Sequence, residues 1–509
     1  MNPLYSVAEI RSIEQAAAAA LPAGVLMQRA GQAAAKKALD LLPATARGTH
    51  VLALAGPGNN GGDALEAAAH LAQAGAHVSI VHFPPAGASS AERQTALQRA
   101  SASAAQLLPY SEELVNSQSW ALVIDGLFGI GLQRPLDGGV RQLVAQINTL
   151  SCPILALDVP SGLDADTGQI IGPIKDDAGD PTEIALRASH TLTFIADKPG
   201  LHTAEGPDFA GLVQVARLEI DGALLPAANL HLNDASYFSR QLSSRRHNSH
   251  KGSYGNVAVL GGASGMQGAP ILAARMALHA GAGRVYALFA GLPLPYDAGQ
   301  PELMCRSAED YDFSSASVVA GPGLGASAQA SALLARAIVA DTPLLLDADA
   351  LNLLASDSAL QQALGARRQP AILTPHPLEA ARLAASSVSE IQADRVRSAR
   401  QLAESYQAIV VLKGSGSIIA APNGDAVINP TGNAALATAG TGDVLAGLCG
   451  SLLAQGWPAW QAALAAVWLH GMAADVLVAE SGNAIGLTAS ELIPAIRTEL
   501  NRLVARKSA

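Results

Sequence analysis

The stretch LALAGPGNNGGDALEAAAHLAQAG, Leu52 to Gly75, decides how the first half of this chain folds. A short apolar run leads into a glycine-rich turn, and an alanine-rich helical pattern follows from about Asp63. Because a strand buried on both faces reads as a continuous apolar run, this order predicts a parallel strand, a tight turn and a helix. The spacing of Gly56, Gly58 and Gly61 also fits G-x-G-x-x-G, the usual pattern of a dinucleotide-binding turn.

Apolar runs of the same kind recur at residues 77–83, 121–129 and 152–162, with helical patterns between them. We therefore expect a doubly wound parallel sheet, a Rossmann-like three-layer α/β domain, in the first half. A polar, irregular stretch follows, and a second α/β series then runs through NVAVLGG, VYALFA, SVVAGPGLG, PLLLDADALN, PAILTPH and AIVVLKG. The 509 residues are too many for one core, so we expect an N-terminal domain at 1–225, a linker at 226–250 and a C-terminal domain at 251–509.

Charge and composition exclude several classes of protein. The net charge of -10 argues against a nucleic-acid partner, which would call for a basic surface. The basic cluster RRHNSHK, Arg245 to Lys251, is interpreted as a solvated linker, with an anion site as the alternative. The three cysteines lack metal or redox spacing, which is typical of a reducing compartment.

No targeting or membrane segment is predicted. The N-terminus carries Glu9 and Glu14 and lacks the apolar core of a signal peptide. The apolar run at 460–479 is interrupted by Gln461, His470 and Asp475, which favours a buried helix over a membrane-spanning one. We therefore expect a cytoplasmic protein without membrane association.

The glycine turn lacks the partner that a dehydrogenase needs. In a dinucleotide-binding unit the second strand ends in an acid that holds the ribose hydroxyl, about 20 residues past the glycines. Here the second strand ends in His82-Phe83-Pro84-Pro85, with no acid. The turn instead carries polar groups of its own, Asn59 to Asp63. A use other than binding a hydride-transfer cofactor is favoured.

Polar groups also follow two other strands. Asp125 and Asp158 stand at strand ends, and the carboxyl ends of parallel strands converge on one crevice. Oxygens of Asn60, Asp125 and Ser161 could hold a hard cation, and the backbone N–H groups of residues 126–132 could cradle a phosphate. The alternative is that each aspartate only caps a helix and each glycine only shapes a turn.

The first half resembles the NAD(P)H-hydrate epimerase family over roughly residues 1 to 220. The resemblance rests on VAEIRSIEQ with LMQRAG, GPGNNGGD, DGLFGIGLQRPLDG, DVPSGLDADTG and TFIADKPGL. It implies a Rossmann-like fold that takes the hydrated nicotinamide nucleotide as substrate and epimerises it at C6. Asp125-Gly126 departs from the Asp-Ala often found in the family, and glycine fits that turn as easily.

The resemblance also implies site residues. Potassium would be bound by Asn60, Asp125 and Ser161. The hydrated nucleotide would be contacted by Asn59, Asn60, Gly61, Gly62, Asp63, Gly129, Ile130, Gly131, Leu132, Gln133, Arg134, Pro135 and Asp158. Opening and reclosing C6 needs a proton donor or acceptor, for which Asp158 and Lys198 are the candidates. Lys198 could equally be a structural surface lysine.

In the second half, the decisive stretch is NPTGNAALATAGTGDVLAGLCGSLLAQG, Asn429 to Gly456. Gly440-Thr441-Gly442-Asp443 opens a long apolar helix, and its exposed N–H groups and dipole favour phosphate oxygens. Asp443 in the first turn could take a proton from a substrate hydroxyl. The alternative is a plain N-cap aspartate before a core helix. No Walker A pattern is present.

Other strand ends supply further candidates. Asp347 and Asp349 follow one strand, Thr374 to Pro377 with Glu379 follow another, and Gly321 to Gly325 follow a third. His376 is interpreted as a site residue, with a buried core histidine as the alternative. The stretch Lys413 to Ser417 follows AIVVL and could meet nucleotide phosphates or adenosine.

This half resembles the ADP-dependent NAD(P)H-hydrate dehydratase family, of ribokinase-like fold, over roughly residues 250 to 490. The resemblance rests on KGSYGNVAVLGG, AGPGLG, LDADALN, TPHPLEAARL, VLKGSGS and NAALATAGTGDVLAG. It implies that the hydrated nucleotide is bound by Ala269, Gly323, His376 and Asp443. It implies that the adenine nucleotide is bound by Lys413, Gly414, Ser415, Gly416, Ser417 and Gly442. Leu378 replaces the glycine of the family's usual TPHPGE, so the resemblance does not determine the conformation of this turn.

Together the halves predict a bifunctional repair enzyme acting on hydrated NADH and NADPH (NADHX and NADPHX). Phosphorylation of the C6 hydroxyl by ADP or ATP makes phosphate the leaving group, with Asp443 as base and the Gly440 to Gly442 amides stabilising charge. K⁺ and Mg²⁺ are the expected ions, and we expect a homo-oligomer. The alternative is a vitamin or sugar kinase of the ribokinase-like superfamily, with a non-catalytic nucleotide- or RNA-binding N-terminal domain.

Overall fold

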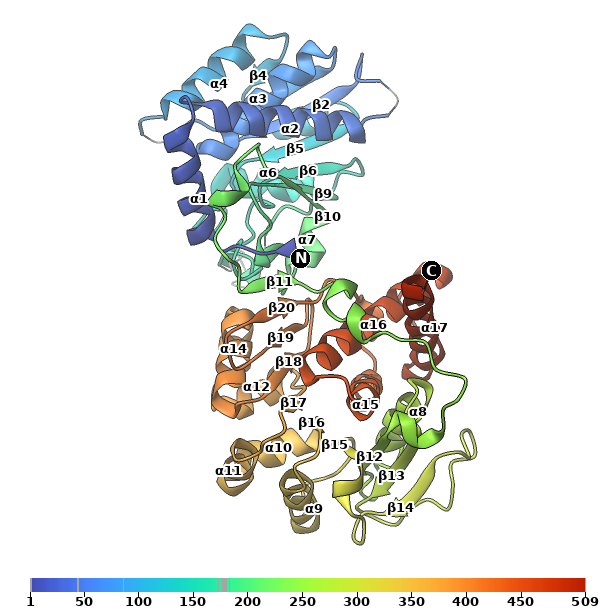
Figure 1. The fold of residues 1–509 in the computed structure, drawn as a ribbon. Coiled ribbons are helices and arrows are strands. Elements are labelled where there is room, and N and C mark those ends of the chain that lie inside the picture. Colours follow the sequence, from blue (N-terminus) through green and yellow to red (C-terminus); the bar gives the residue numbers. More distant parts are fainter. Residues whose placement is uncertain are drawn as a thin grey trace. The chain divides into compact units, whose positions relative to one another are not determined.

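The computed structural model describes residues 2–43, 45–85, 87–172, 174–175, 181–182 and 184–508. The chain divides into two compact units: Pro3–Ala228 forms the first, and Asn2 together with the chain from Asn229 onward forms the second. Each unit is built around its own sheet (Figure 1). The α/β architecture expected for both halves is confirmed.

The N-terminal unit holds a 7-stranded sheet in the order β10-β9-β6-β5-β2-β3-β4. All neighbouring pairs are parallel. Its strands are β2 (His50–Ala55), β3 (His77–His82), β4 (Gln106–Leu108), β5 (Leu122–Gly126), β6 (Ile154–Leu157), β9 (His190–Phe194) and β10 (Leu212–Ala216). The sequence predicted β2, β3, β5 and β6, whereas β4, β9 and β10 were not predicted. A two-stranded antiparallel pair, β7 (Ile174–Lys175) and β8 (Pro181–Thr182), lies outside this sheet.

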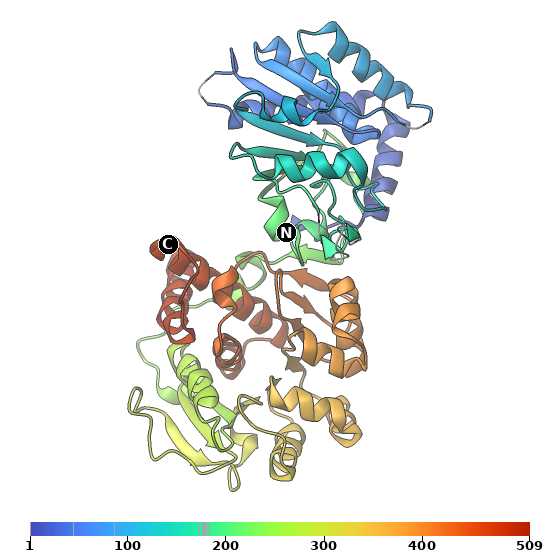
Figure 2. The same ribbon diagram turned by 180° about the vertical axis from the view of Figure 1, so that it is seen from behind.

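Both faces of this sheet are covered, which is why its strands read as continuous apolar runs. Val51, Ala53 and Ala55 of β2 belong to one buried cluster, whereas Leu52 and Leu54 belong to another. The helix α2 lies in front of the sheet in Figure 1, and α6 lies in front of it in Figure 2. The helices are α1 (Val7–Ala20), α2 (Val25–Leu41), α3 (Asn59–Gln73), α4 (Ala91–Ala102), α5 (Glu112–Asn116), α6 (Gly138–Ile147) and α7 (Gly206–Ala210).

The helix after the glycine turn begins at Asn59, four residues before the expected start near Asp63. The two glycines counted as part of the turn are therefore helical. A Cβ on Gly61 would stand 2.0 Å from the carbonyl oxygen of Gly56, so the helix can approach the strand this closely only without a side chain there. The early start places the Asn60 and Asp63 side chains in the first turns of α3.

The C-terminal unit holds an 11-stranded sheet in the order β1-β11-β20-β19-β18-β17-β16-β15-β12-β13-β14. The pairs from β18 through β14 are parallel, whereas β18-β19 and β19-β20 are antiparallel. The strands are β1 (Asn2–Pro3), β11 (Leu230–Leu232), β12 (Asn256–Gly261), β13 (Arg284–Phe289), β14 (Met304–Ser307), β15 (Ser317–Ala320), β16 (Leu344–Leu346), β17 (Ala371–Leu373), β18 (Ile409–Leu412), β19 (Ile418–Ala420) and β20 (Ala426–Ile428).

Helices cover both faces of this sheet as well. Figure 1 shows α8, α15, α16 and α17 on one face and α9, α10, α11, α12 and α14 on the other. Their bounds are α8 (Gly268–His279), α9 (Ala328–Val339), α10 (Asp349–Ser356), α11 (Ser358–Gly365), α12 (Pro377–Leu383), α13 (Val388–Ala393), α14 (Arg395–Tyr406), α15 (Thr441–Ala454), α16 (Ala459–Ser481) and α17 (Ala489–Ser508).

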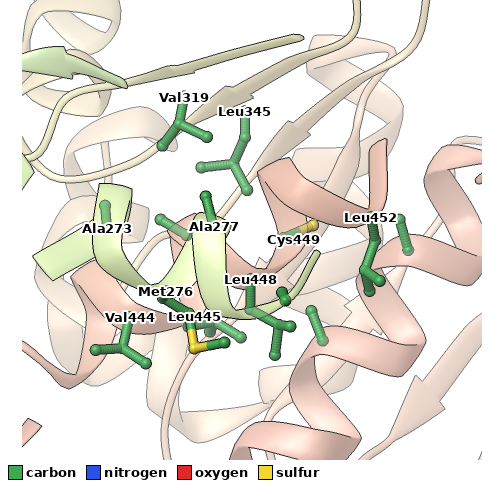
Figure 3. Close-up of a cluster of buried hydrophobic side chains, with 14 of the residues drawn as sticks. Ala273, Met276, Ala277, Val319, Leu345, Val444, Leu445, Leu448, Cys449 and Leu452 are labelled. Carbon is green, nitrogen blue, oxygen red and sulfur yellow. The ribbon is translucent and has the colours of Figure 1, made fainter. Parts of the chain in front are cut away.

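The core of this unit lies between α15, α8 and the sheet (Figure 3). Leu445, Leu448 and Leu452 of α15 are buried there with Met276 of α8. Small residues let the two helices approach, because a Cβ on Gly447 would stand 2.0 Å from the carbonyl oxygen of Ala273. This contact fixes the position of α15, whose first turn carries Asp443.

Part of the segment that the sequence analysis assigned to a linker is structured. The strand β11 pairs with β20 at Leu230, His231 and Leu232. Phe238 is fully buried in the core of the C-terminal unit. The basic cluster from Arg245 to Lys251 is exposed, and the Arg245 guanidinium stacks 3.8 Å from the centre of the Tyr254 ring.

Candidate functional site

In the N-terminal unit, a cavity of about 640 Å³ lies at the carboxyl ends of the parallel strands. It is bounded by α1, α2, the turn after β2 and the loop after β5. The predicted substrate-binding residues among its lining are Asn59, Asn60, Asp63, Gly129, Ile130, Gly131, Leu132 and Asp158. Gly61 and Gly62 lie behind it, against Gly56 and Met27. Gln133, Arg134 and Pro135 are outside the lining in the part of the chain that the structure describes.

Asp125 and Ser161 form one buried cluster beside this cavity. The Ser161 hydroxyl donates to Asp125 Oδ1 at 2.7 Å, and the Ser161 backbone N–H donates to Oδ2 at 2.8 Å. The backbone N–H of Leu127 also donates to Oδ1, at 3.1 Å. Burial nevertheless raises the pKa of Asp125 to about 6, because these hydrogen bonds only partly offset the loss of hydration.

Asn60 presents an unsatisfied acceptor in the same region. Its Nδ2 donates to the carbonyl oxygen of Leu157 at 3.0 Å. Its Oδ1 is buried and has no hydrogen-bond partner among the described residues. A buried carbonyl oxygen without a donor costs free energy, so this atom fits a cation ligand. The oxygen donors of Asn60, Asp125 and Ser161 therefore suit a hard cation such as potassium.

Asp158 and Lys198 form an ion pair at the ends of the adjacent strands β6 and β9. The Lys198 Nζ lies 2.8 Å from Asp158 Oδ1. The same ammonium donates to Thr193 Oγ1 and to the carbonyl oxygens of Phe194 and Ala196, at 2.6–3.2 Å. Lys198 is fully buried, whereas Asp158 lines the cavity. The interpretation of Lys198 as a surface lysine is therefore wrong.

The Asp158 carboxylate is also held from the other side. Its Oδ2 accepts a hydrogen bond from the Ile130 backbone N–H at 3.2 Å. A Cβ on Gly129 would stand 2.7 Å from the same oxygen, so the loop can close on the carboxylate only with glycine there. Asp158 itself has φ = 67°, an uncommon conformation for a residue with a side chain. The strained backbone aims the carboxyl group into the cavity.

Two further carboxyl groups, those of Asp63 and Glu14, line this cavity and have no hydrogen-bond or ion-pair partner among the described residues. Asp63 is 8% exposed, and its carboxyl group makes no hydrogen bond or ion pair within the described residues. Burial, followed by the charges of Asp158 and Glu14, raises the pKa of Asp63 well above its ordinary value. Burial also raises the pKa of Glu14, and Asp158 adds to the shift. In the sequence, Glu14 counted against a signal peptide and lay within the family motif VAEIRSIEQ, but nothing there marked it as a cavity residue.

In the C-terminal unit, three neighbouring strands end in polar side chains that meet. Asp347 follows β16, Thr374 follows β17 and Lys413 follows β18. The Lys413 Nζ lies 2.7 Å from Asp347 Oδ1, and the Thr374 hydroxyl donates to the same oxygen at 2.8 Å. Burial alone would lower the pKa of Lys413, but the carboxylates of Asp347 and Glu379 outweigh it and raise the pKa.

This group lies against the start of α15. A Cβ on Gly442 would stand 3.6 Å from Lys413 Nζ and 3.8 Å from Asp347 Oδ2. Gly440 caps the helix with φ = 89°, a conformation that favours glycine, and no side chain caps the first N–H groups. Burial, reinforced by the charge of Asp347, raises the pKa of Asp443 to about 7. A base with such a pKa suits proton transfer near neutral pH.

His376 caps α12 and is not a core histidine. Its Nδ1 accepts hydrogen bonds from the backbone N–H groups of Leu378 and Glu379, at 3.1 and 3.2 Å. Its Nε2 lies 3.2 Å from Glu379 Oε1, and the ring side chain is 46% exposed. Because Nδ1 accepts these hydrogen bonds, the ring proton lies on Nε2, and burial and the nearby Lys413 lower the pKa of His376. Leu378 fits the turn where the family often has glycine.

The remaining predicted residues surround the same region. Ala269 lies in the first turn of α8, and a Cβ on Gly323 would stand 3.4 Å from its Cβ. The stretch Gly414 to Ser417 turns back on itself, with the Ser417 hydroxyl donating to the Gly414 carbonyl oxygen at 3.1 Å. Gly414 has φ = 137° and approaches the guanidinium of Arg395, which is buried and donates to the Lys413 carbonyl oxygen. Ser415 and Gly416 complete this turn.

Two polar side chains of α16 to which the sequence assigned no role hold the segment that leads into α15 and its first turn. His470 of α16 donates from Nε2 to the carbonyl oxygen of Thr441 at 3.0 Å. Burial lowers the pKa of His470 to about 4, so this ring stays neutral. Asp475 accepts hydrogen bonds from the Gly432 N–H and the Asn433 side chain, at 2.9 and 2.8 Å. The signal for both residues was present as polar interruptions in an apolar helix.

Two family models match the chain. Residues 257–498 match the family described as NAD(P)H-hydrate dehydratase, and residues 23–200 match the family described as YjeF-related protein N-terminus. A "Bifunctional NAD(P)H-hydrate repair enzyme Nnr" from Coxiella burnetii is 37% identical over 98% of this chain and 100% of its own length.

Two further relatives match the second half. The "ADP-dependent (S)-NAD(P)H-hydrate dehydratase" of Neisseria meningitidis is 45% identical over 53% of this chain and 94% of its own length. A crystal structure of the ADP/ATP-dependent NAD(P)H-hydrate dehydratase from Bacillus subtilis, co-crystallised with ATP/Mg²⁺, is 31% identical. It covers 53% of this chain and 97% of its own, with a TM-score of 0.45. Because the Coxiella relative matches over its whole length, this chain belongs to the bifunctional NAD(P)H-hydrate repair enzyme family.

Proposed function

We propose that this chain repairs hydrated NADH and NADPH in two steps. The N-terminal unit interconverts the R and S hydrates, and the C-terminal unit dehydrates the S form at the expense of ADP or ATP. The observation that carries the proposal is the position of Asp443, a carboxyl group with a pKa of about 7 at the uncapped start of a helix beside Lys413. Such a site can deprotonate a hydroxyl group and receive a phosphoryl group at the same place.

In the proposed epimerase step, Asp158 contacts the hydrated ring. Its carboxylate lines the cavity and can exchange a proton with the C6 hydroxyl group as that centre opens and recloses. Lys198 remains a candidate for the acid–base chemistry and would act through Asp158, because its ammonium already meets four oxygen atoms. The residues at the turn after β2 and the loop after β5 would hold the nucleotide.

Potassium would be held by the oxygens of Asn60, Asp125 and Ser161. The buried Asn60 Oδ1, which has no hydrogen-bond partner among the described residues, supports this assignment. A potassium ion held there would supply positive charge to the site, and its ligand Ser161 also holds the loop at Phe128. That loop is already tied by the hydrogen bond from the Phe128 N–H to Ser161 Oγ at 2.9 Å.

In the proposed dehydratase step, Asp443 takes the proton of the C6 hydroxyl group. The hydroxyl oxygen then forms a bond to the terminal phosphorus of ADP or ATP, and the bond from that phosphorus to the bridging oxygen breaks. Phosphate subsequently leaves C6 with its bonding electrons, a proton leaves C5, and the dihydronicotinamide double bond is restored. The N–H groups at the start of α15 would stabilise charge on the transferred group.

Magnesium would neutralise the phosphates of the nucleotide. Among the described residues, no group of three or more His, Cys, Asp and Glu side chains could hold a metal ion. Magnesium needs no such group, because it keeps several waters and binds mainly through substrate phosphates. Lys413 to Ser417 with Gly442 would contact the adenine nucleotide.

The proposal extends to the setting of the enzyme. We propose that it is a cytoplasmic homo-oligomer without a nucleic-acid or membrane partner. Its net charge of -10 supports the absence of nucleic acid. Within the described residues, α16 is the one helix long and apolar enough to cross a membrane, and 61% of its apolar window is buried, as in a core helix.

The test is recovery of the dihydronicotinamide absorbance from a mixture of both hydrated NADPH epimers. The reaction contains the protein with ADP or ATP, magnesium and potassium. Full recovery is expected for the wild type. Asp158→Ala should stop recovery near half, because only the S form remains a substrate, whereas the exposed Asp208→Ala serves as the matched control. No recovery with either nucleotide, together with a stable phosphorylated alcohol as product, would favour a small-alcohol kinase instead.

A further inference from the structure

Asp347 is a buried carboxylate at the centre of the C-terminal sheet. It is 1% exposed and lies at the end of β16, the strand that pairs with β15 and β17 in the middle of the parallel part of the sheet. A buried carboxylate needs compensation, and here Thr374 and Lys413 supply it at 2.8 and 2.7 Å. Asp347 therefore ties together the ends of three adjacent strands.

Lys413 is the partner that reaches the helix. Its side chain is 21% exposed, whereas that of Asp347 is 2% exposed. Its Nζ lies 3.6 Å from where a Cβ of Gly442 would stand, at the uncapped N-terminus of α15. A second carboxylate, Glu379 Oε2, lies 3.8 Å from the same Nζ. The ammonium is thus held by two carboxylates and lies beside the start of α15, where the transferred phosphoryl group is proposed to bind.

Asp443 shares this space and has no ion pair of its own among the described residues. The charged groups that act on it are Asp347, Lys413 and Asp349, and the nearby His470 of α16 is neutral. The charge of Asp443 already acts on the Lys413 ammonium, so an ammonium released from Asp347 is free to pair with Asp443. A cation on that carboxylate would weaken it as a base.

We infer that Asp347 is a positioning residue of the dehydratase half, which holds the Lys413 ammonium toward the transferred phosphoryl group and away from the base Asp443. This inference rests on the proposed function of the C-terminal unit. It assigns Asp347 no contact with the substrate. It also gives Lys413 a role in phosphoryl transfer, in addition to binding the adenine nucleotide.

The first test is Asp347→Asn in the full-length enzyme, assayed on the S hydrate with ADP and magnesium. The kcat should fall by roughly 10- to 100-fold, because a misplaced catalytic group commonly costs about that much. The acidic limb of the kcat/KM profile should also move to lower pH. The variant removes the negative charge of Asp347, which raises the pKa of Asp443, and it frees Lys413 to pair with Asp443. An unmoved limb with wild-type kcat would overturn the inference.

The matched control is Asp297→Asn. Asp297 is 8% exposed and forms a two-point ion pair with Arg275 at 2.6 and 2.7 Å, outside the site. The control variant should lose stability as Asp347→Asn does, but the acidic limb of its kcat/KM profile should stay at the wild-type pH. A shift of the limb in both variants would mean that general loosening causes it, which would also overturn the inference.

A double-mutant cycle tests whether Asp347 acts through Lys413. In a Lys413→Met background, Asp347→Asn should cause little further loss of kcat. Losses that multiply would show that Asp347 acts independently and would contradict the proposed role. The crystal structure of the Asp347→Asn variant gives a readout without turnover, with Lys413 Nζ expected within ion-pair distance of Asp443. This readout separates the inference from the proposed function, because an inactive wild type would defeat only the latter.

Discussion

Each unit carries a lysine–aspartate ion pair at the carboxyl ends of its parallel strands, and the two pairs face their sites in opposite ways. In the N-terminal unit the Lys198 side chain is fully buried and Asp158 faces the cavity, at 0% and 12% exposure. In the C-terminal unit Asp347 is buried and Lys413 faces the site, at 2% and 21%. The exposed partner matches the proposed chemistry, since a carboxylate exchanges protons and an ammonium attracts phosphate.

The surroundings of the two pairs differ in the same sense. The cavity around Asp158 holds two more carboxyl groups, Asp63 and Glu14, whose pKa values are raised by burial. The space in front of Lys413 instead contains the uncapped start of α15 and the proposed base, Asp443. One site is therefore built to accept and donate protons, and the other to receive an anion.

The largest expected effect is that of Asp443→Asn. Loss of the general base should lower dehydration of the S hydrate by about 10²- to 10⁴-fold. Interconversion of the R and S hydrates should continue at the wild-type rate, because the other unit supplies that step. The exposed Asp310→Asn is the control, and absorbance recovery with a chiral separation of the hydrates measures both activities. Loss of both activities in Asp443→Asn would contradict the assignment of the two reactions to separate sites.

Next comes Lys198→Met compared with Lys413→Met. Removing Lys198 leaves a largely buried carboxylate without its cation, which should cost about 3–5 kcal/mol of unfolding free energy in the N-terminal unit. Removing Lys413 likewise leaves a buried carboxylate, Asp347, without its cation, and should cost a similar amount of unfolding free energy in the C-terminal unit. Only Lys413→Met should also lower dehydratase activity. Urea denaturation followed for each unit and absorbance recovery from the S hydrate measure the two effects, with the exposed Lys36→Met as control. Loss of dehydratase activity in Lys198→Met, or its retention in Lys413→Met, would contradict the proposed asymmetry of the pairs.

The pH dependence of the dehydratase reaction should report the ionisation of the Asp443 carboxyl group. Its carboxyl group must be ionised to act as a base, and its pKa is raised to about 7. The kcat/KM for the S hydrate should therefore fall about tenfold for each pH unit below that value. The measurement is initial rates between pH 5 and pH 9, expressed as the fraction of the plateau. A profile that stays flat down to pH 5 would remove Asp443 as the base.

The smallest expected effect is on the stability of Asp63→Asn. Because the folded state raises the pKa of Asp63, the folded protein binds more protons than the unfolded one above the ordinary pKa of an aspartate. Its stability therefore falls as the pH rises through this range. The amide should remove that loss, so the variant should melt higher than the wild type at pH 8, with little difference at pH 4. The exposed Asp40→Asn should show no such trend.

Most of the parallel strands could be predicted from the sequence, because strands buried on both faces appear there as continuous apolar runs. Sequence reasoning did not predict β19 and β20, whose three-residue lengths carry little periodicity, although the Asn423-Gly424 pair between them is a strong hairpin signal. It also took Gly61 and Gly62 as parts of a turn. Only the contact with the strand shows that these glycines are helical.

For this protein the sequence by itself determined the order of elements, the position of polar residues at strand ends and the family resemblance. These are local features, since a strand, its glycine turn and the next helix are neighbours in the chain. The tertiary structure decided which residues meet. Asp347 and Lys413 are 66 residues apart, and only the pairing of β16, β17 and β18 brings their side chains within 2.7 Å. Burial, which determines charge and pKa, is likewise a property of the packed molecule and not of any segment.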